Sequence, residues 1–140
     1  MGGMRRTFAR VLVGAVLLVG VAVPAQATAP AATLRVAEPR ELQVGDRAAL
    51  SVTLTLPAQA GAPLLLTQSV EGEALEVVRG RLLRSDARDP QASPLSFDVP
   101  VLARAPGTSI VRVHALIYLC DAQCEAVEIE QRVSVRVLAR

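Results

Sequence analysis

Apolar and polar residues alternate along much of this chain, in short segments separated by turn-forming residues. The clearest segment runs from Ala48 to Leu56, where leucine occupies positions 50, 54 and 56, valine occupies position 52, and serine or threonine lies between them. A period of two is that of a β-strand with one face toward a core and one face toward solvent. The abundance of valine also favours strands, so we predict an all-β protein.

The remaining strands are predicted from the same alternation and from the glycines and prolines between segments. The segment from Leu34 to Val44 is expected to form one short strand interrupted by Pro39. Pro100 lies inside another predicted strand and indicates an edge position or a bulge, because proline cannot donate to a ladder. The other predicted strands span residues 64–70, 95–102, 109–119 and 125–138.

Three segments add detail to this pattern. The leucine run 64–66 is typical of a strand that is covered on both faces. The segment 74–83 is ambiguous between a helical turn and strands, with Gly80 favouring strands, and the polar segment 84–93 is expected to be a loop. Seven or eight strands separated by turns roughly every 8–12 residues are typical of an immunoglobulin-like antiparallel β-sandwich, which is the fold class we predict.

Cys120 and Cys124 suggest a register for the predicted C-terminal hairpin. If the two cysteines face each other across the turn, the numbers of paired residues sum to 244. One face of the hairpin then contains apolar pairs and the other contains polar and charged pairs, as a correct register requires. The apolar pairs are Val111 with Val133, Ala115 with Ile129 and Ile117 with Val127. Two pairs fit less well and suggest a bulge, namely Val113 with Gln131 and Arg112 with Arg132.

The first 27 residues have the features of an export signal. Arg5, Arg6 and Arg10 precede an apolar run of 13 residues, and small residues at positions 25 and 27 follow it. The run is shorter than the roughly 20 residues that a membrane-spanning helix needs, so no membrane anchor is expected after cleavage. We predict a signal peptide over residues 1–27, cleavage after Ala27, and one domain over residues 28–140. The general secretory and twin-arginine routes both remain open, and either leads to the periplasm or the exterior of a bacterium.

The charge of the predicted mature chain is nearly balanced. Without the three arginines of the signal, 12 arginines oppose 13 acidic residues, a net charge of −1. This balance gives no indication of a nucleic-acid partner or of an anionic membrane surface. The 113 residues are enough for one ordinary domain with an aliphatic core.

The two cysteines allow three kinds of chemistry. A structural disulfide is the first, although a loop this short removes little chain entropy. Exchange with the thiol of a partner protein is the second, because an exposed disulfide at a hairpin tip is accessible. Copper(I) capture by the reduced thiolates is the third. His114 could assist the copper ion only by a fold-back, since it lies six residues from Cys120, or roughly 20 Å along a strand.

Other residues indicate no catalytic site. His114 is expected on the solvent face, paired with Glu130, and Tyr118 is expected to pack over the disulfide. The acidic residues are scattered without a calcium-loop or paired-carboxylate pattern. We therefore predict no enzymatic activity, apart from possible thiol–disulfide exchange, and no cofactor or resident metal.

The stretch from Ile110 to Leu138, anchored by Tyr118, Cys120 and Cys124, resembles the last hairpin of a family of exported β-sandwich domains. The family is the C-terminal domain that follows thioredoxin-like and NHL-repeat regions. A more distant resemblance is to the N-terminal domain of the periplasmic thiol:disulfide interchange reductase, whose reactive cysteines have a longer spacing.

Two main hypotheses follow from these observations. In the first, the chain is a non-enzymatic module that binds or supports another envelope protein. In the second, which the resemblance suggests, Cys120 and Cys124 exchange electrons with a thioredoxin-like partner while Tyr118 supports the exchange. Copper(I) binding is a third, weaker hypothesis.

Overall fold

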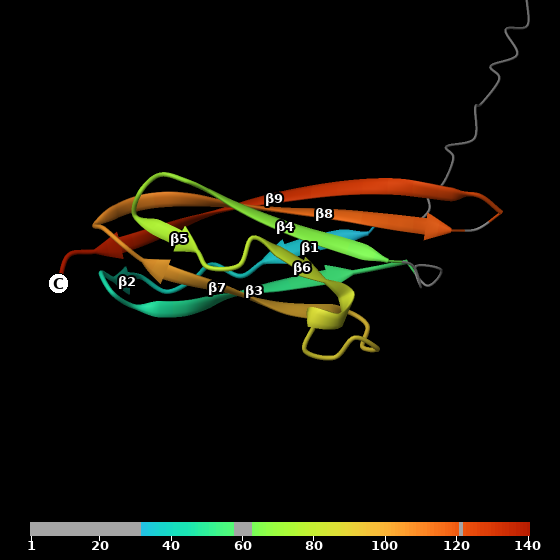
Figure 1. The fold of residues 1–140 in the computed structure, drawn as a ribbon, viewed down its shortest axis with the longest axis horizontal. Helices are drawn as coiled ribbons and strands as arrows, with labels where there is room; N and C mark the ends of the chain where they lie inside the picture. Colours follow the sequence, from blue (N-terminus) through green and yellow to red (C-terminus); the bar gives the residue numbers. More distant parts are fainter. Residues whose placement is uncertain (1–31, 58–62, 121) are drawn as a thin grey trace, which may run out of the picture.

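The computed structural model describes residues 32–57, 63–120 and 122–140, which form two β-sheets packed face to face (Figure 1). The predicted signal peptide and its cleavage site lie outside the described residues. None of the described residues forms a helix long and apolar enough to cross a membrane. The strands are β1 (Thr33–Val36), β2 (Leu42–Gln43), β3 (Arg47–Thr55), β4 (Leu64–Glu71), β5 (Leu75–Val77), β6 (Arg81–Leu83), β7 (Leu95–Ala103), β8 (Gly107–Cys120) and β9 (Cys124–Leu138), and one 3₁₀ turn, η1 (Arg84–Asp86), follows β6.

The strand order confirms the predicted immunoglobulin-like β-sandwich. One sheet has the order β1-β3-β7-β5 and the other has the order β2-β9-β8-β4-β6. All pairs are antiparallel except β2 with β9, which run parallel. The described residues form nine strands rather than seven or eight, because the first predicted strand is two strands in different sheets. Pro39 lies in the segment that crosses between them.

The ambiguous segment 74–83 also divides between the two sheets. It contains two short strands, β5 and β6, with Gly80 between them, and no helix. The polar segment that follows is a loop apart from η1, much as the sequence indicated. Short strands that change sheets in this way close the two open sides of a sandwich.

Pro100 forms no bulge, but it does occupy an edge position locally, although β7 as a whole is not an edge strand. β7 lies between β3 and β5, and its ladder with β3 is unbroken. The carbonyl of Pro100 accepts a hydrogen bond from the backbone N–H of Val78 at 3.0 Å, so the nitrogen of Pro100 faces the β5 side as well. Because the pairing of β5 with β7 ends at Val77, the missing N–H removes no ladder bond.

The core is aliphatic apart from Phe97 and takes alternate residues from both sheets. Leu64 and Leu66 are buried, whereas Leu65 points to the outer face and is only partly buried. The leucine run therefore alternates like the other strands, and the prediction that it is covered on both faces was wrong. The largest fully buried side chains are Phe97, Leu50, Leu54, Leu66, Leu95, Ile117, Val52, Val99, Val101, Val111, Val113 and Val135.

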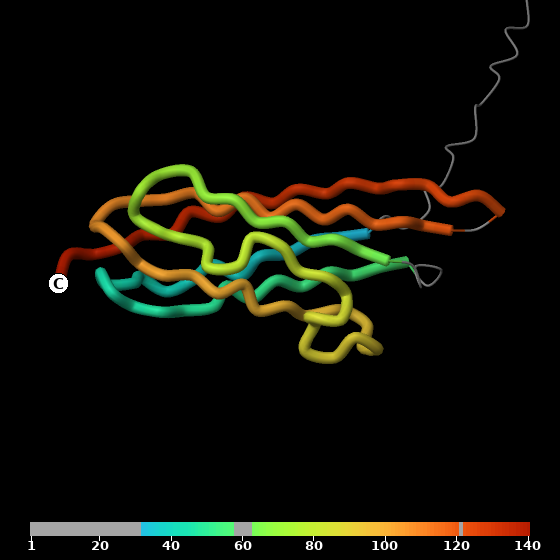
Figure 2. Tube along the Cα trace, in the orientation of Figure 1, coloured from blue at the N-terminus to red at the C-terminus, as the bar shows by residue number. Residues whose placement is uncertain are grey.

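The hairpin of β8 and β9 has the predicted register along its whole length, and its two strands lie side by side across the molecule (Figure 2). The ladder runs without a bulge from Gly107 opposite Val137 to Cys120 opposite Cys124, so the suggested bulges at Gln131 and at the arginine pair were wrong. Arg112 can lie opposite Arg132 without a bulge, because the carboxylates of Glu71 and Glu130 lie next to Arg112 and neutralise its charge.

Candidate functional site

The end of the hairpin projects beyond the sandwich (Figure 1). The pairing of β4 with β8 begins at Leu64 opposite Ile117, so Tyr118 and the residues after it have no third strand beside them in the described part of the chain. A two-stranded ribbon without a core is only marginally stable in water. This part of the chain therefore needs another constraint to hold its shape.

The disulfide between Cys120 and Cys124 supplies that constraint. The two cysteines are directly opposed, bonded, and have Cα atoms 4.0 Å apart. Both are exposed to solvent, and the described residues contain no free cysteine. The bond closes the ribbon where packing cannot, and its sulfur atoms lie at the surface where another thiol can reach them.

An apolar row crosses the outer face of the sheet next to the disulfide. Leu83 in β6 lies opposite Leu65 in β4, and Leu65 lies opposite Leu116 in β8. Tyr118 is two residues farther along β8 on the same face, because alternate residues of a strand share a face. Tyr118 is 42% exposed and Leu83 is 51% exposed. We call Leu65, Leu83, Leu116, Tyr118 and the Cys120–Cys124 bond the distal apolar face.

Charged residues continue the same outer face beyond the apolar row. His114 lies opposite Glu130 in the register, as expected, but its ring Nε2 is nearest to a carboxylate oxygen of Glu128, at 3.8 Å. Glu130 lies instead between two guanidinium groups, at 3.3 Å from Arg112 Nε and 3.1 Å from Arg132 Nε. The carboxylate of Glu130 therefore pairs with two arginines rather than with His114.

The ionisable side chains of the described residues form ion pairs rather than a metal-binding cluster. No group of three or more histidine, cysteine, aspartate or glutamate side chains could hold a metal ion in the part of the chain that is described. The resolved pKa shifts belong to ion pairs around the loop between β6 and β7. A hydrogen bond from Arg88 lowers the pKa of Asp98, and the backbone N–H of Leu83 lowers the pKa of Asp86. These groups stabilise a loop and do not gather at a cleft.

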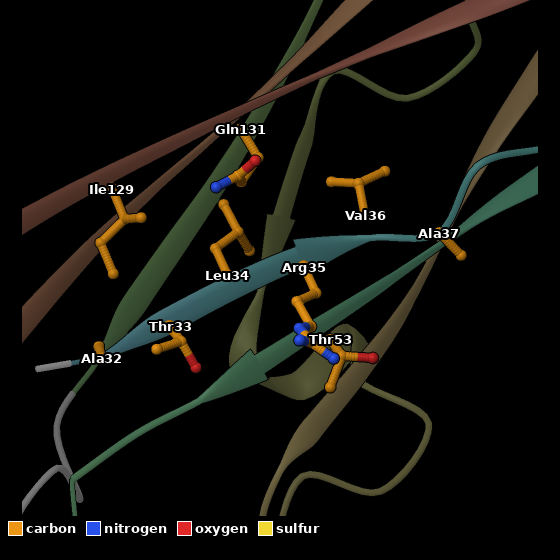
Figure 3. A pocket seen from close by; sticks show the side chains of 9 residues that line it. All are labelled: Ala32, Thr33, Leu34, Arg35, Val36, Ala37, Thr53, Ile129 and Gln131. Atoms are coloured by element: carbon orange, nitrogen blue, oxygen red, sulfur yellow. The ribbon is translucent and has the colours of Figure 1, made fainter. Parts of the chain in front are cut away.

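A groove of about 820 Å³ opens between β1 and β9 (Figure 3). Ile129 and Gln131 line it from β9, above the side chains of Leu34 and Val36 from β1. Ile129 was predicted to lie on the apolar face of the hairpin, but its side chain is only partly buried. The groove could not be found from the sequence, because it depends on the proximity of strands almost 100 residues apart.

Comparisons with known proteins support the fold only. No family model and no curated protein sequence matches the chain. The chain is similar to trypsin-activated alpha-2-macroglobulin from Escherichia coli, with a TM-score of 0.54 and 17% identity over 78% of this chain and 7% of that chain. It is also similar to native E. coli alpha-2-macroglobulin spanning domain MG7 to the C-terminus, with a TM-score of 0.52 and 16% identity over 76% of this chain and 16% of that chain.

The chain thus spans less than a fifth of either macroglobulin chain, and its likeness is to a single sandwich within a larger protein. The finer resemblance of the hairpin to domains that follow thioredoxin-like and NHL-repeat regions stays a prediction. The described chain has the fold of an immunoglobulin-like domain of the kind found in bacterial alpha-2-macroglobulin.

Proposed function

We propose that this protein is a non-enzymatic β-sandwich module of the bacterial envelope that binds another envelope protein through its distal apolar face. The observation that carries the proposal is the position of Tyr118 and Leu83, two large exposed apolar side chains on one face of one sheet. Contiguous exposed apolar surface on a soluble domain marks interaction sites. Tyrosine is enriched in such sites because it combines a large apolar ring with a hydroxyl group.

The surroundings of this face favour a protein partner over a small molecule. The distal apolar face lies on the outer surface of a sheet. Its residues line neither the groove between β1 and β9 nor a smaller hollow of about 340 Å³ beside Val78 and Pro100. Small-molecule sites are typically concave and bury most of the ligand. A strand face with a projecting hairpin instead offers a broad contact area.

The disulfide and the predicted signal support an extracytoplasmic location. Disulfides form and persist in oxidising compartments such as the bacterial periplasm. The bond at the hairpin tip holds Tyr118 and the end of β8 in a fixed shape, which reduces the entropy lost when a partner binds. The structural role of the bond and the binding role of the face are therefore compatible.

Site-specific photo-crosslinking in the exporting cell tests this proposal. A benzophenone side chain at position 118 or 83 should form a covalent adduct with one envelope protein. Val78 provides a matched control, because it is 60% exposed and apolar but follows β5 of the other sheet. Adducts of equal yield from position 78, or none from positions 118 and 83, would refute the proposal.

Affinity measurements with the captured protein complete the test. Tyr118→Ser and Leu83→Ser should each raise the dissociation constant at least tenfold, which corresponds to about 1.4 kcal/mol. Val78→Ser should leave it within about a factor of two. Equal effects of all three substitutions would indicate general destabilisation rather than a binding face, and thermal unfolding curves would distinguish these cases.

Thiol–disulfide exchange is the second candidate function, and the solvent exposure of Cys120 and Cys124 supports it. A thiolate of a thioredoxin-like partner would attack one sulfur and form a mixed disulfide. The second thiol of the partner would then release the reduced cysteine pair and leave the partner oxidised. Equilibration in glutathione buffers decides the question. A potential below roughly −300 mV indicates a structural bond, whereas a value near −200 mV indicates an exchangeable one.

A further inference from the structure

The outer edge of β9 has no partner strand among the described residues over most of its length. β9 pairs with β8 on one side, and on the other side β2 reaches only Val137 and Leu138. Within the described residues, the stretch from Cys124 to Arg136 is therefore a free edge. Such an edge presents unpaired backbone N–H and C=O groups that can pair with another strand.

The geometry of the hairpin identifies which backbone groups face outward. The Cα separation of 4.0 Å between Cys120 and Cys124 is that of a pair without mutual hydrogen bonds, which is typically about 4.5 Å. Even-numbered residues of β9 therefore direct their N–H and C=O away from β8. The same parity holds at the end of the strand, where Leu138 O accepts a hydrogen bond from Val44 N at 3.1 Å. The free edge thus offers the backbone groups of Ala126, Glu128, Glu130, Arg132 and Ser134, up to the point where the ladder with β2 begins.

Several features that prevent edge pairing are missing from this stretch, although its outward face is charged. Proteins protect edges with prolines, bulges, very short strands, and charged side chains on the edge or pointing inward. Residues 124–136 contain no proline or glycine, and the ladder with β8 has no bulge. On the inward face of this stretch, between Val127 and Val135, the one polar residue is the uncharged Gln131.

Acidic and basic side chains lie in different halves of this edge. Glu125, Glu128 and Glu130 lie in the first half of β9, and Arg132 and Arg136 lie in the second. Another copy of the same strand, running antiparallel, places its basic half beside the acidic half of the first copy. We propose that two copies of this chain associate through their β9 edges about a two-fold axis at Gln131, and so join their larger sheets into one continuous sheet.

The charges along the edge select the register. A two-fold axis at Gln131 pairs residues 128–134 of the two copies, a stretch that lies wholly within the free edge. A two-fold axis at Gln131 places Glu130 of the first copy opposite Arg132 of the second. It likewise places Arg132 of the first copy opposite Glu130 of the second. A shift of the axis by one residue places two Glu130 or two Arg132 side chains opposite each other, which is unfavourable.

The inward face of β9 fits the same register. Gln131, which is exposed in the single chain, meets Gln131 of the second copy, and two side-chain amides can hydrogen-bond to each other. Ile129 lies opposite Val133 of the second copy, so an apolar pair forms beside the groove between β1 and β9 (Figure 3). Association therefore pairs the open edge and covers the partly buried Ile129. It does not use the side chains of the distal apolar face.

Sedimentation of the purified protein over a range of concentrations tests the association. We expect a monomer–dimer equilibrium whose dissociation constant rises at least tenfold for Arg132→Glu, because Glu130 then faces another glutamate. The matched control is Arg81→Glu, the same charge reversal on an exposed residue of β6, at the opposite edge of the same sheet. The exchange variant Glu130→Arg/Arg132→Glu should restore dimerisation to within about threefold of the original. A protein that stays monomeric up to about 1 mM, or a dimer that both reversals weaken equally, would overturn the proposal.

Crosslinking tests the register independently of charge. Gln131→Cys places two thiols opposite each other across the axis, so mild oxidation should convert the protein to a covalent dimer. Ser134→Cys is the control, because the two residues at position 134 are offset by six residues, or roughly 20 Å along the strands. Equal crosslinking of the two variants would contradict the register, and no crosslinking of Gln131→Cys in a protein that sediments as a dimer would place the interface elsewhere.

Discussion

The side-chain oxygen of Ser109 accepts a hydrogen bond from the backbone N–H of Ala74 at 3.1 Å, and this bond joins the two sheets of the sandwich. Ser109 belongs to β8 in one sheet and is fully buried, whereas Ala74 immediately precedes β5 in the other. The same oxygen also accepts from the N–H of Leu75 at 3.2 Å. One hydroxyl group thus satisfies two backbone donors at a point where the chain crosses between layers.

Ser109→Ala should lower the free energy of unfolding by about 1–3 kcal/mol, because two buried N–H groups lose their acceptor. Urea denaturation measures the change. Ser134→Ala is the matched control, since Ser134 is exposed in β9 and its substitution should change stability by about 0.5 kcal/mol or less. Equal effects of the two substitutions would show that the Ser109 hydroxyl does not contribute as described.

Gly72→Ala should destabilise the protein by about 1–3 kcal/mol, because Gly72 has a φ of +103° that other residues rarely adopt. An added Cβ would also lie 3.0 Å from the Ser109 oxygen and 3.3 Å from the carbonyl oxygen of Thr108. Gly80→Ala is the control, because its φ is not positive and its nearest neighbour, the carbonyl oxygen of Gln68, would be 3.5 Å away. Thermal unfolding should show a lower midpoint for Gly72→Ala than for Gly80→Ala. A Gly72→Ala protein as stable as the original would contradict the prediction that alanine is strained at this position.

Gln68→Met should leave the free energy of unfolding unchanged or raise it by up to about 1 kcal/mol. Gln68 is 7% exposed, and both polar atoms of its side chain have no hydrogen-bond partner in the described residues. Burial of an unpaired amide costs about 1–3 kcal/mol in proteins, and methionine has a similar shape. A loss of more than about 1 kcal/mol on denaturation would indicate that the amide is hydrogen-bonded in solution.

Asp98→Asn should reduce stability at neutral pH, and the difference from the unmodified protein should shrink below about pH 4. Arg88 donates to Asp98 through Nε at 2.8 Å and through a second nitrogen, which lowers the pKa of this carboxyl. A lowered pKa in the folded state stabilises it above the unfolded pKa of about 3.9, and this contribution disappears as the pH falls through the folded pKa. Unfolding curves from pH 7 to pH 2 test this expectation.

The same measurements at about 1 M salt provide the control for Asp98→Asn. Both side chains of the ion pair are roughly half exposed, so salt should screen their interaction and narrow the difference between the two proteins. A difference that is independent of both pH and salt would assign the effect to packing rather than to charge.

Replacement of both Cys120 and Cys124 by serine should lower the free energy of unfolding by about 2 kcal/mol or less, because the enclosed loop is short. The sandwich should remain folded, since the bond lies outside the core at the projecting tip. Circular dichroism and hydrogen exchange should show a loss of protection confined to the tip of the hairpin. Global unfolding of the double variant would assign the disulfide a larger role than its position indicates.

Part of this structure could be predicted because the relevant information is local. The alternation in residues 48–56 identifies a strand and its buried face without knowledge of its neighbours. The hairpin register followed from Cys120 and Cys124 because the two strands are adjacent in sequence and a shift by one residue would expose the apolar face. The disulfide could be identified because its two cysteines lie close together in sequence, at the turn of one hairpin.

The all-β class, the aliphatic core, most strands and the register of the last hairpin could be predicted, since these depend on periodicity and on neighbouring segments. Other features emerge only when the sheets pack: which sheet each short strand joins, the interior position of β7, the contact of Leu83 with Leu65, and the free edge of β9 within the described residues. An alternating pattern shows which side chains are buried but not which distant strand lies beside them. That choice depends on how all the strands pack together.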